Sequence, residues 1–195
     1  MVILNDRGIS AEIVESCGRG DRDAFRTLYG AYKDRVYSIA LYFFHGDAAQ
    51  AGDATQQVFL KLMTSMAQFR GQSDFATWLY RVVTSVCMDG ARRRAAQREA
   101  PEERLAGLAG AASQEEDLAR EEIAGAVRAA VSSLPPKLRL PVLLRYFDEL
   151  SYEQMASALA CSVGTVSSRL SRGHRMLAGK LAWLRRPDMG QNVGR

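Results

Sequence analysis

Hydrophobic residues recur every three or four positions along most of the chain, which is the pattern of amphipathic helices. Asp21 is the predicted N-cap of the first such helix. Its apolar face consists of Phe25, Leu28, Tyr29, Tyr32, Val36 and Ile39. The sequence HGD at residues 45–47 ends this helix. A second helix is predicted over residues 48–66, and its inward positions are Val58, Phe59, Leu62 and Met66.

The next hydrophobic run lies in FRGQSDFATWLYRVV, residues 69–83, with Ser73 as the predicted N-cap of a third helix. Its apolar stripe consists of Phe75, Trp78, Leu79, Val82, Val83 and Val86. We expect most of the Trp78 side chain to pack in the core, which leaves at most one edge for stacking. Alternation typical of strands is absent from the sequence, so the predicted fold class is all-α.

Composition changes between residues 95 and 125, where Ala, Gly, Glu and Arg dominate and bulky apolar residues are scarce. Such a segment favours a solvated, flexible linker. We therefore predict two small helical domains joined by a linker over residues 96–122. The first domain spans residues 1–95 and the second spans residues 123–186, followed by a tail over residues 187–195.

The second block contains LSYEQMASALACSVGTVSSRLSRGHRML, residues 150–177, which predicts a helix-turn-helix. Ser151 and Gln154 fit a capping box, and Ser162 is placed to cap the second helix after a turn at residues 160–162. The predicted inward positions are Met155, Ala156, Leu159, Val163, Val166 and Leu170. The remaining face carries short hydroxyls and arginines, which suit the major groove: Thr165, Ser167, Ser168, Arg169, Ser171, Arg172 and Arg175.

The charge along this block separates DNA binding from an ordinary solvated helical hairpin. No Asp or Glu occurs between Glu153 and Asp188, whereas six basic residues do. A solvated face usually mixes both signs, so one-signed charge favours DNA binding. The first block has its own basic patch, which Asp89 interrupts. The patch consists of Arg81, Arg92, Arg93, Arg94 and Arg98.

Composition excludes several other classes of protein. Of the 195 residues, 47% are hydrophobic and 25% are charged, as in ordinary globular proteins. No apolar run is long enough to cross a bilayer, and the start of the chain lacks a signal-peptide pattern, so we expect a cytoplasmic protein without membrane insertion. The three cysteines are far apart and both histidines are isolated. We therefore expect no metal site, no cofactor and no catalytic residues.

Five segments, in this order, resemble the bacterial sigma factors of the extracytoplasmic-function class, which contain only regions two and four. The segments are DAFRTLYGAYKDRVYSIA, DATQQVFLKLM, FRGQSDFATWLYRVV, LPPKLRLPVLLRYFDELSYEQMA and SVGTVSSRL. The resemblance covers roughly residues 21–94 and 134–181. It implies a dissociable subunit that directs core RNA polymerase to specific promoters and initiates transcription.

The resemblance also implies partners and their contact residues. The second helix should dock on the clamp helices of the polymerase through Asp53, Gln56, Gln57, Phe59 and Leu60. Phe59 and Leu60 are expected to pack behind the polar residues, and Asp53 could alternatively serve only as a helix cap. Gln57 stands where relatives more usually have Glu. Many relatives are held by an anti-sigma factor, for which this chain has no motif of its own.

Promoter contacts follow from the same resemblance. The loop over residues 70–74 should receive a base flipped out of the minus-ten element. The predicted minus-ten residues are Arg70, Gly71, Gln72, Ser73, Asp74, Trp78, Arg81, Ser85, Arg92, Arg93 and Arg94. Ser85 replaces a common Asn, and it either faces the melted strand or is buried against Val82. The seven polar residues of the helix-turn-helix should read the minus-thirty-five element.

Two other classes of protein remain as alternatives. A stand-alone helix-turn-helix regulator would need a sensor or dimerisation domain, for which the first block is unsuited. An enzyme would need a nucleophile–base pair or a metal set, and neither pattern occurs in the sequence.

Overall fold

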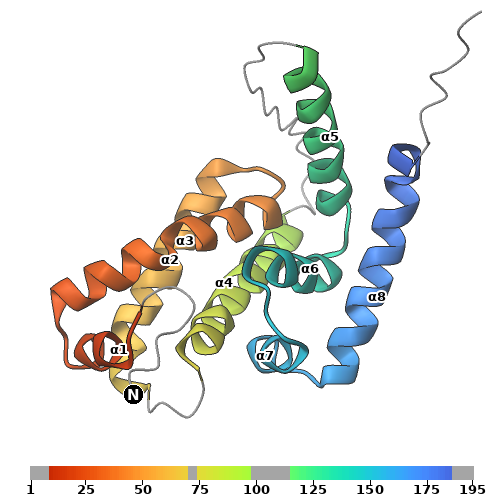
Figure 1. The fold of residues 1–195 in the computed structure, drawn as a ribbon. Coiled ribbons are helices and arrows are strands. Elements are labelled where there is room, and N and C mark those ends of the chain that lie inside the picture. The colour runs from red at the N-terminus through yellow and green to blue at the C-terminus, as the bar shows by residue number, and fades with distance from the viewer. Residues whose placement is uncertain (1–8, 70–73, 98–114, 186–195) are drawn as a thin grey trace, which may run out of the picture.

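The computed structural model describes residues 9–69, 74–97 and 115–185, and these residues are helical throughout apart from short turns, with no strand among them (Figure 1). The predicted all-α class is confirmed. The helices are α1 (Ala11–Gly18), α2 (Arg22–Phe43), α3 (Ala48–Ser65), η1 (Met66–Gln68), α4 (Phe75–Gln97), α5 (Glu115–Ser132), α6 (Pro136–Asp148), α7 (Tyr152–Ala158), α8 (Val163–Lys180) and η2 (Ala182–Arg185). Helix α1, capped by Ser10, was not predicted.

The N-terminal helices begin and end at the residues that the capping pattern indicates. The Asp21 side chain accepts hydrogen bonds from the backbone of Asp23 and Ala24, as an N-cap does. The turn after α2 contains His45 and Gly46 with φ of 62° and 82°. Asp47 then caps α3 through the Gln50 backbone N–H, so the alternative role of Asp53 as a helix cap is wrong.

Most predicted inward positions of the first block are buried. Val58, Phe59, Leu62 and Met66 are at most 5% exposed, and the α4 stripe is buried apart from the half-buried Trp78 and Val82. Tyr29 is the exception, because it is 42% exposed and lies at the edge of the α2–α3 pair. The predicted N-cap Ser73 lies outside the described residues, as do residues 98–114 of the linker.

The helix-turn-helix forms as predicted from its capping residues. Ser151 and Gln154 make both hydrogen bonds of a capping box at the start of α7. The Ser162 side chain accepts from the Thr165 backbone N–H and caps α8. Val166 and Leu170 are buried. The inward assignment of Val163 is wrong, since this first residue of α8 is 42% exposed and precedes the turns that pack on α6 and α7.

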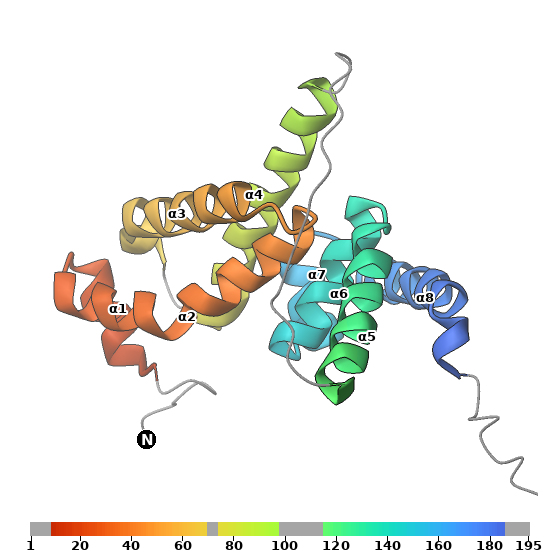
Figure 2. The ribbon, with the colours of Figure 1, turned by 90° about the horizontal axis from the view of Figure 1, so that it is seen from above.

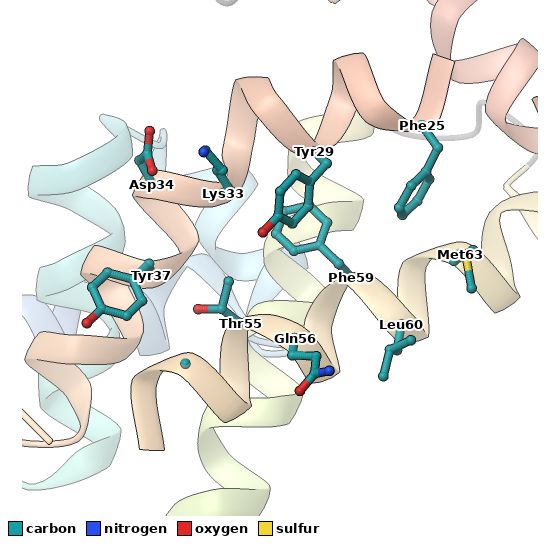
Figure 3. A pocket seen from close by; sticks show the side chains of 11 residues that line it. Phe25, Tyr29, Lys33, Asp34, Tyr37, Thr55, Gln56, Phe59, Leu60 and Met63 are labelled. Atoms are coloured by element: carbon teal, nitrogen blue, oxygen red, sulfur yellow. The ribbon is translucent and has the colours of Figure 1, made fainter. Parts of the chain in front are cut away.

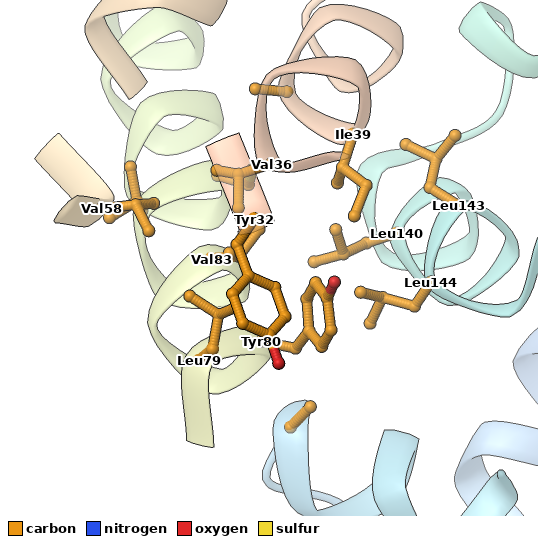
Figure 4. Packing of buried hydrophobic residues seen from close by; sticks show 14 of the residues in the cluster. Tyr32, Val36, Ile39, Val58, Leu79, Tyr80, Val83, Leu140, Leu143 and Leu144 are labelled. Atoms are coloured by element: carbon orange, nitrogen blue, oxygen red, sulfur yellow. The ribbon is translucent and has the colours of Figure 1, made fainter. Parts of the chain in front are cut away.

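The N-terminal and C-terminal halves of the chain share one hydrophobic core. Helix α2 packs against α6, and α4 packs against α7, so that the two halves of the chain lie side by side (Figures 1 and 2). Figure 4 shows Ile39 of α2 and Tyr80 of α4 beside Leu140 and Leu144 of α6. All four side chains are completely buried.

Polar contacts reinforce this junction. The Thr84 hydroxyl of α4 donates to the Ala158 carbonyl of α7 at 2.7 Å. The Arg35 guanidinium of α2 lies 3.1 Å from an Asp148 carboxylate oxygen at the end of α6. The two halves therefore meet through matched polar groups as well as apolar surface.

A buried arginine lies at the centre of the junction. Arg139 of α6 is 3% exposed, and its guanidinium donates to the carbonyls of Phe43, Ser132 and Leu134. These carbonyls lie at the ends of α2 and α5, where helix dipoles favour a cation. Burial, with the nearby Arg94 charge, lowers the pKa of Arg139 to about 10, so the guanidinium stays charged at neutral pH and joins three helices.

Candidate polymerase and promoter interfaces

A partly apolar groove of about 410 Å³ lies between α2 and α3. Figure 3 shows Phe25 and Tyr29 of α2 facing Phe59, Leu60 and Met63 of α3. The Tyr29 and Phe59 rings meet edge to face with centroids 4.7 Å apart. Leu60 and Met63 are 52% and 56% exposed. Exposed apolar side chains gathered in one concave surface are typical of a protein-docking site.

The five predicted polymerase-binding residues divide between two faces of α3. Gln56, Phe59 and Leu60 line the α2–α3 groove, whereas Asp53 and Gln57 line a second hollow between α3 and α4. Phe59 is buried behind the groove surface as predicted. Leu60 does not pack behind it, because half of its surface faces solvent.

The start of the predicted minus-ten site is only partly described. Arg70, Gly71, Gln72 and Ser73 lie outside the described residues, and Asp74 is exposed just before α4. Trp78 is half-buried, with its ring centroid 5.1 Å from that of Phe69 and 5.9 Å from that of Phe75. This aromatic cluster packs Phe69 against the first turns of α4.

One face of α4 presents polar and basic groups in a row. Arg81, Ser85 and Arg92 are exposed there, so the alternative of a buried Ser85 is wrong. The Ser85 hydroxyl lies 3.5 Å from an Asp89 carboxylate oxygen. Asp89 also accepts a hydrogen bond from Arg92, and this bond is the main cause that lowers the pKa of the Asp89 carboxyl. Asp89 thus holds Ser85 and Arg92 on a common surface.

Arg93 and Arg94 lie on a different face of α4. The Arg93 guanidinium is 3.5 Å from the Gln57 side-chain oxygen, and that of Arg94 is 3.4 Å from the oxygen of Gln50. Both arginines line the α3–α4 hollow together with Asp53. Arg98 lies outside the described residues. The described part of the predicted basic patch is split, and within it only Arg81 and Arg92 share a face with Ser85.

The predicted minus-thirty-five residues form the outer surface of α8. Ser167, Ser168, Ser171, Arg172 and Arg175 are exposed, and Thr165 is half-buried. The Arg172 guanidinium folds back on the preceding turn, where Nε donates to the Ser168 carbonyl at 3.2 Å and Nη2 lies 3.4 Å from the Ser168 hydroxyl. Ser168 therefore positions the arginine that stands at the centre of this face.

Arg169 is less exposed than the other two arginines among the predicted minus-thirty-five residues. It is half-buried, and its Nη1 lies 3.8 Å from the Cys161 sulfur in the turn before α8. It also lines a cavity of about 340 Å³ between the two domains, together with Arg81, Arg92 and Lys137. Lys137 was not predicted as a site residue, because only the packing of α6 against α4 brings it to this cavity.

The described residues contain no group of three metal-ligating side chains. Cys17 and Cys87 are buried and unpaired, and burial raises the pKa of the Cys87 thiol to about 12. A thiol of this kind packs as a small apolar group and is a poor nucleophile. Among the described helices, none is both long and apolar enough to cross a membrane.

Comparison with known proteins identifies the family. Residues 28–97 match the family described as Sigma-70 region 2, and residues 124–177 match Sigma-70, region 4. The chain is 33% identical over 177 residues to the RNA polymerase sigma-H factor of Pseudomonas aeruginosa, covering 85% of this chain and 90% of that one. It is 30% identical over 178 residues to the ECF sigma factor SigW of Bacillus subtilis, covering 86% and 94% of the two chains.

The ECF sigma-E factor of Escherichia coli K12 is 33% identical over 179 residues, covering 87% of this chain and 92% of that one. Among solved structures, CnrH in complex with the cytosolic domain of CnrY has the same fold, with a TM-score of 0.65 at 21% identity, covering 88% of this chain and 96% of that one. The sigma factor RpoE of Bartonella quintana, solved with the anti-sigma factor NepR, gives a TM-score of 0.65 at 20% identity, covering 81% and 96%.

The chain belongs to the sigma-70 family, in its extracytoplasmic-function class. It directs RNA polymerase to promoters for the initiation of transcription.

Proposed function

We propose that the chain docks on core polymerase through the α2–α3 groove, reads the minus-ten element with α4 and reads the minus-thirty-five element with α8. The observation that carries this assignment is the placement of three exposed surfaces of two chemical kinds: an apolar groove between α2 and α3, and basic, hydroxyl-bearing faces on α4 and α8. An apolar groove suits a protein partner, while exposed arginines and hydroxyls suit DNA. These surfaces occur within the two segments that match regions two and four.

In the docking step, Leu60 and Met63 bury their exposed surface against the polymerase, and Gln56 supplies hydrogen bonds at the rim of the groove. Burying apolar area is worth about 25 cal/mol per Å² before the costs of association. Asp53 and Gln57, on the other side of α3, form a separate polar contact. Because Arg93 lies against Gln57, this second contact also borders the DNA-reading helix.

In the minus-ten step, Arg81 and Arg92 hold phosphates of the melted strand while Ser85 faces its bases. Unstacking a base costs a few kcal/mol, which contacts to the flipped base must offset. The predicted loop residues Gln72 and Ser73, with the neighbouring Asp74, supply donors and acceptors for the edge of that base. The aromatic cluster around Trp78 holds Phe69, the residue just before this segment, against α4.

In the minus-thirty-five step, α8 enters the major groove. Arg172 reaches a base edge, and Ser167 and Ser171 leave room for close approach because their side chains are short.

The domains must also separate, because Arg81 and Arg169 border one cavity in the closed chain and cannot both lie against distant promoter elements. Docking on polymerase supplies the free energy for this opening.

The cellular setting of the protein follows from its role at the promoter. We infer that it acts in the cytoplasm as a DNA-binding initiation subunit and has no enzymatic activity of its own. The solved relatives CnrH and RpoE are complexed with CnrY and the anti-sigma factor NepR, respectively. A regulatory partner of the same kind is therefore the expected regulator here.

Run-off transcription tests the proposal. Purified chain is mixed with core polymerase and a library of promoters that varies in both elements. We expect specific transcripts that require both proteins and depend on sequence in both elements. A stand-alone helix-turn-helix regulator would yield no such transcripts, so their absence with an active polymerase would reject the proposed function.

A further inference from the structure

The cavity between the two domains is a concentration of positive charge. Arg81 and Arg92 reach it from α4, Lys137 from α6 and Arg169 from α8. Among the described residues, no Asp or Glu lines it. Arg92 is paired with Asp89, but no ion pair joins Arg81, Lys137 or Arg169 to an acid within the part of the chain that the structure describes. Three unpaired cations from three helices therefore face one hollow.

This arrangement favours the entry of an anion into the closed chain. Like charges that line a concave, partly desolvated surface repel one another, and they attract anions strongly because the field is concentrated there. An anion that contacts both domains has these contacts only when the domains are together. By linkage, such an anion shifts the chain toward the closed arrangement.

We propose that the cavity binds a small polyphosphate anion that bridges α4, α6 and α8. A volume of about 340 Å³ suits a small molecule, whereas a helix of a protein partner is about 10 Å across with its side chains. Guanidinium groups match phosphate oxygens through paired N–H donors, and the exposed Ser85 hydroxyl adds a further donor at the rim. The bound anion occupies Arg81 and Arg169, so it competes with promoter DNA.

A substitution of Lys137 tests the anion site apart from the DNA interfaces, because Lys137 lines the cavity but belongs to neither predicted promoter surface. Arg175 is the matched control: it is exposed on α8 in the DNA-facing set and does not line the cavity. The test is calorimetric titration of the full chain with inorganic pyrophosphate, without divalent cations and at constant ionic strength. Wild type, Lys137→Ala and Arg175→Ala are compared.

We expect one saturable site in the wild type, with affinity about fivefold weaker in Lys137→Ala, since one partly exposed charge contact is worth up to about 1 kcal/mol. Arg175→Ala should bind as the wild type does. Lys137→Ala should retain run-off transcription, which keeps this test independent of the proposed function. The absence of saturable binding, or equal weakening by both variants, would overturn the proposal.

Hydrogen exchange tests the bridging. Pyrophosphate should slow amide exchange in both α4 and the α6–α7 segment, because the bound state opens less often. Protection confined to one of these segments would refute a bridge between the domains, even if the anion binds.

Discussion

At the scale of single residues, Arg172 and Ser168 form a hydrogen-bonded pair on the face of α8 that we propose reads the promoter. Because Ser168 holds the guanidinium on the surface of the helix, Arg172 is preorganised for a base contact. Arg172→Ala should weaken recognition of the upstream element by about 1–3 kcal/mol if the contact is bidentate. Transcription from promoters with single changes in that element measures the effect.

A loss of transcription that is the same for every upstream element would contradict a base contact by Arg172. If Arg172→Ala reduced transcription equally from wild-type and altered upstream elements, Arg172 would contact phosphate instead of a base.

Ser85 gives a second test at this scale. Its exposed hydroxyl lies beside Asp89 and has less reach than the longer side chain of Asn. Asn offers both a donor and an acceptor to a base edge, so Ser85→Asn should sharpen the preference at one base of the minus-ten element. The measurement is transcription from a promoter set varied through that element. An unchanged preference profile would reject a reading role for this position.

At the scale of elements, the α2–α3 groove can be tested without disturbing the core. Leu60 is half exposed, so Leu60→Glu should fold normally and place a carboxylate among apolar side chains. We expect polymerase affinity to fall about tenfold or more, equivalent to roughly 1.4 kcal/mol. Binding to core polymerase is measured beside Thr64→Glu, a neighbouring exposed position of α3 outside the groove. Equal loss in both variants would place docking elsewhere.

The close packing of α4 against the Phe44 ring depends on Gly90. A Cβ added at Gly90 would lie 2.7 Å from the Phe44 ring, so Gly90→Ala should destabilise the fold by about 1–3 kcal/mol. Gly30 of α2 is exposed with no such neighbour within 4 Å, and Gly30→Ala should stabilise by about 0.5–1 kcal/mol. Denaturant unfolding of both variants measures the difference, and similar stabilities would contradict this packing.

Much at this scale was predictable from the sequence. Caps at Asp21, Ser151 and Ser162 follow from local hydrogen bonding, and periodicity identified the buried faces of α3 and α4. The exposure of Tyr29 and Val163 was not predictable in this way, because hydrophobic spacing does not reveal where a helix face leaves the core. The division of the arginines between two faces of α4 likewise depends on how α3 packs beside them.

At the scale of the whole molecule, the sequence predicted two domains but not their shared core. The junction depends on contacts between distant segments, such as Thr84 with Ala158 and Arg139 with Phe43. No local pattern indicates these pairs. The closed chain brings together the surfaces that we propose contact two distant promoter elements. We therefore expect promoter recognition to depend on the polymerase, which would separate and space α4 and α8.

Promoter binding with and without core polymerase tests this central claim most directly. The free chain should bind promoter duplex weakly at physiological salt, with little loss when either element is scrambled. In the complex with core polymerase, binding should become tight and should fall when either the minus-ten or the minus-thirty-five element is scrambled. Tight, sequence-specific binding of the duplex by the free chain would contradict the account.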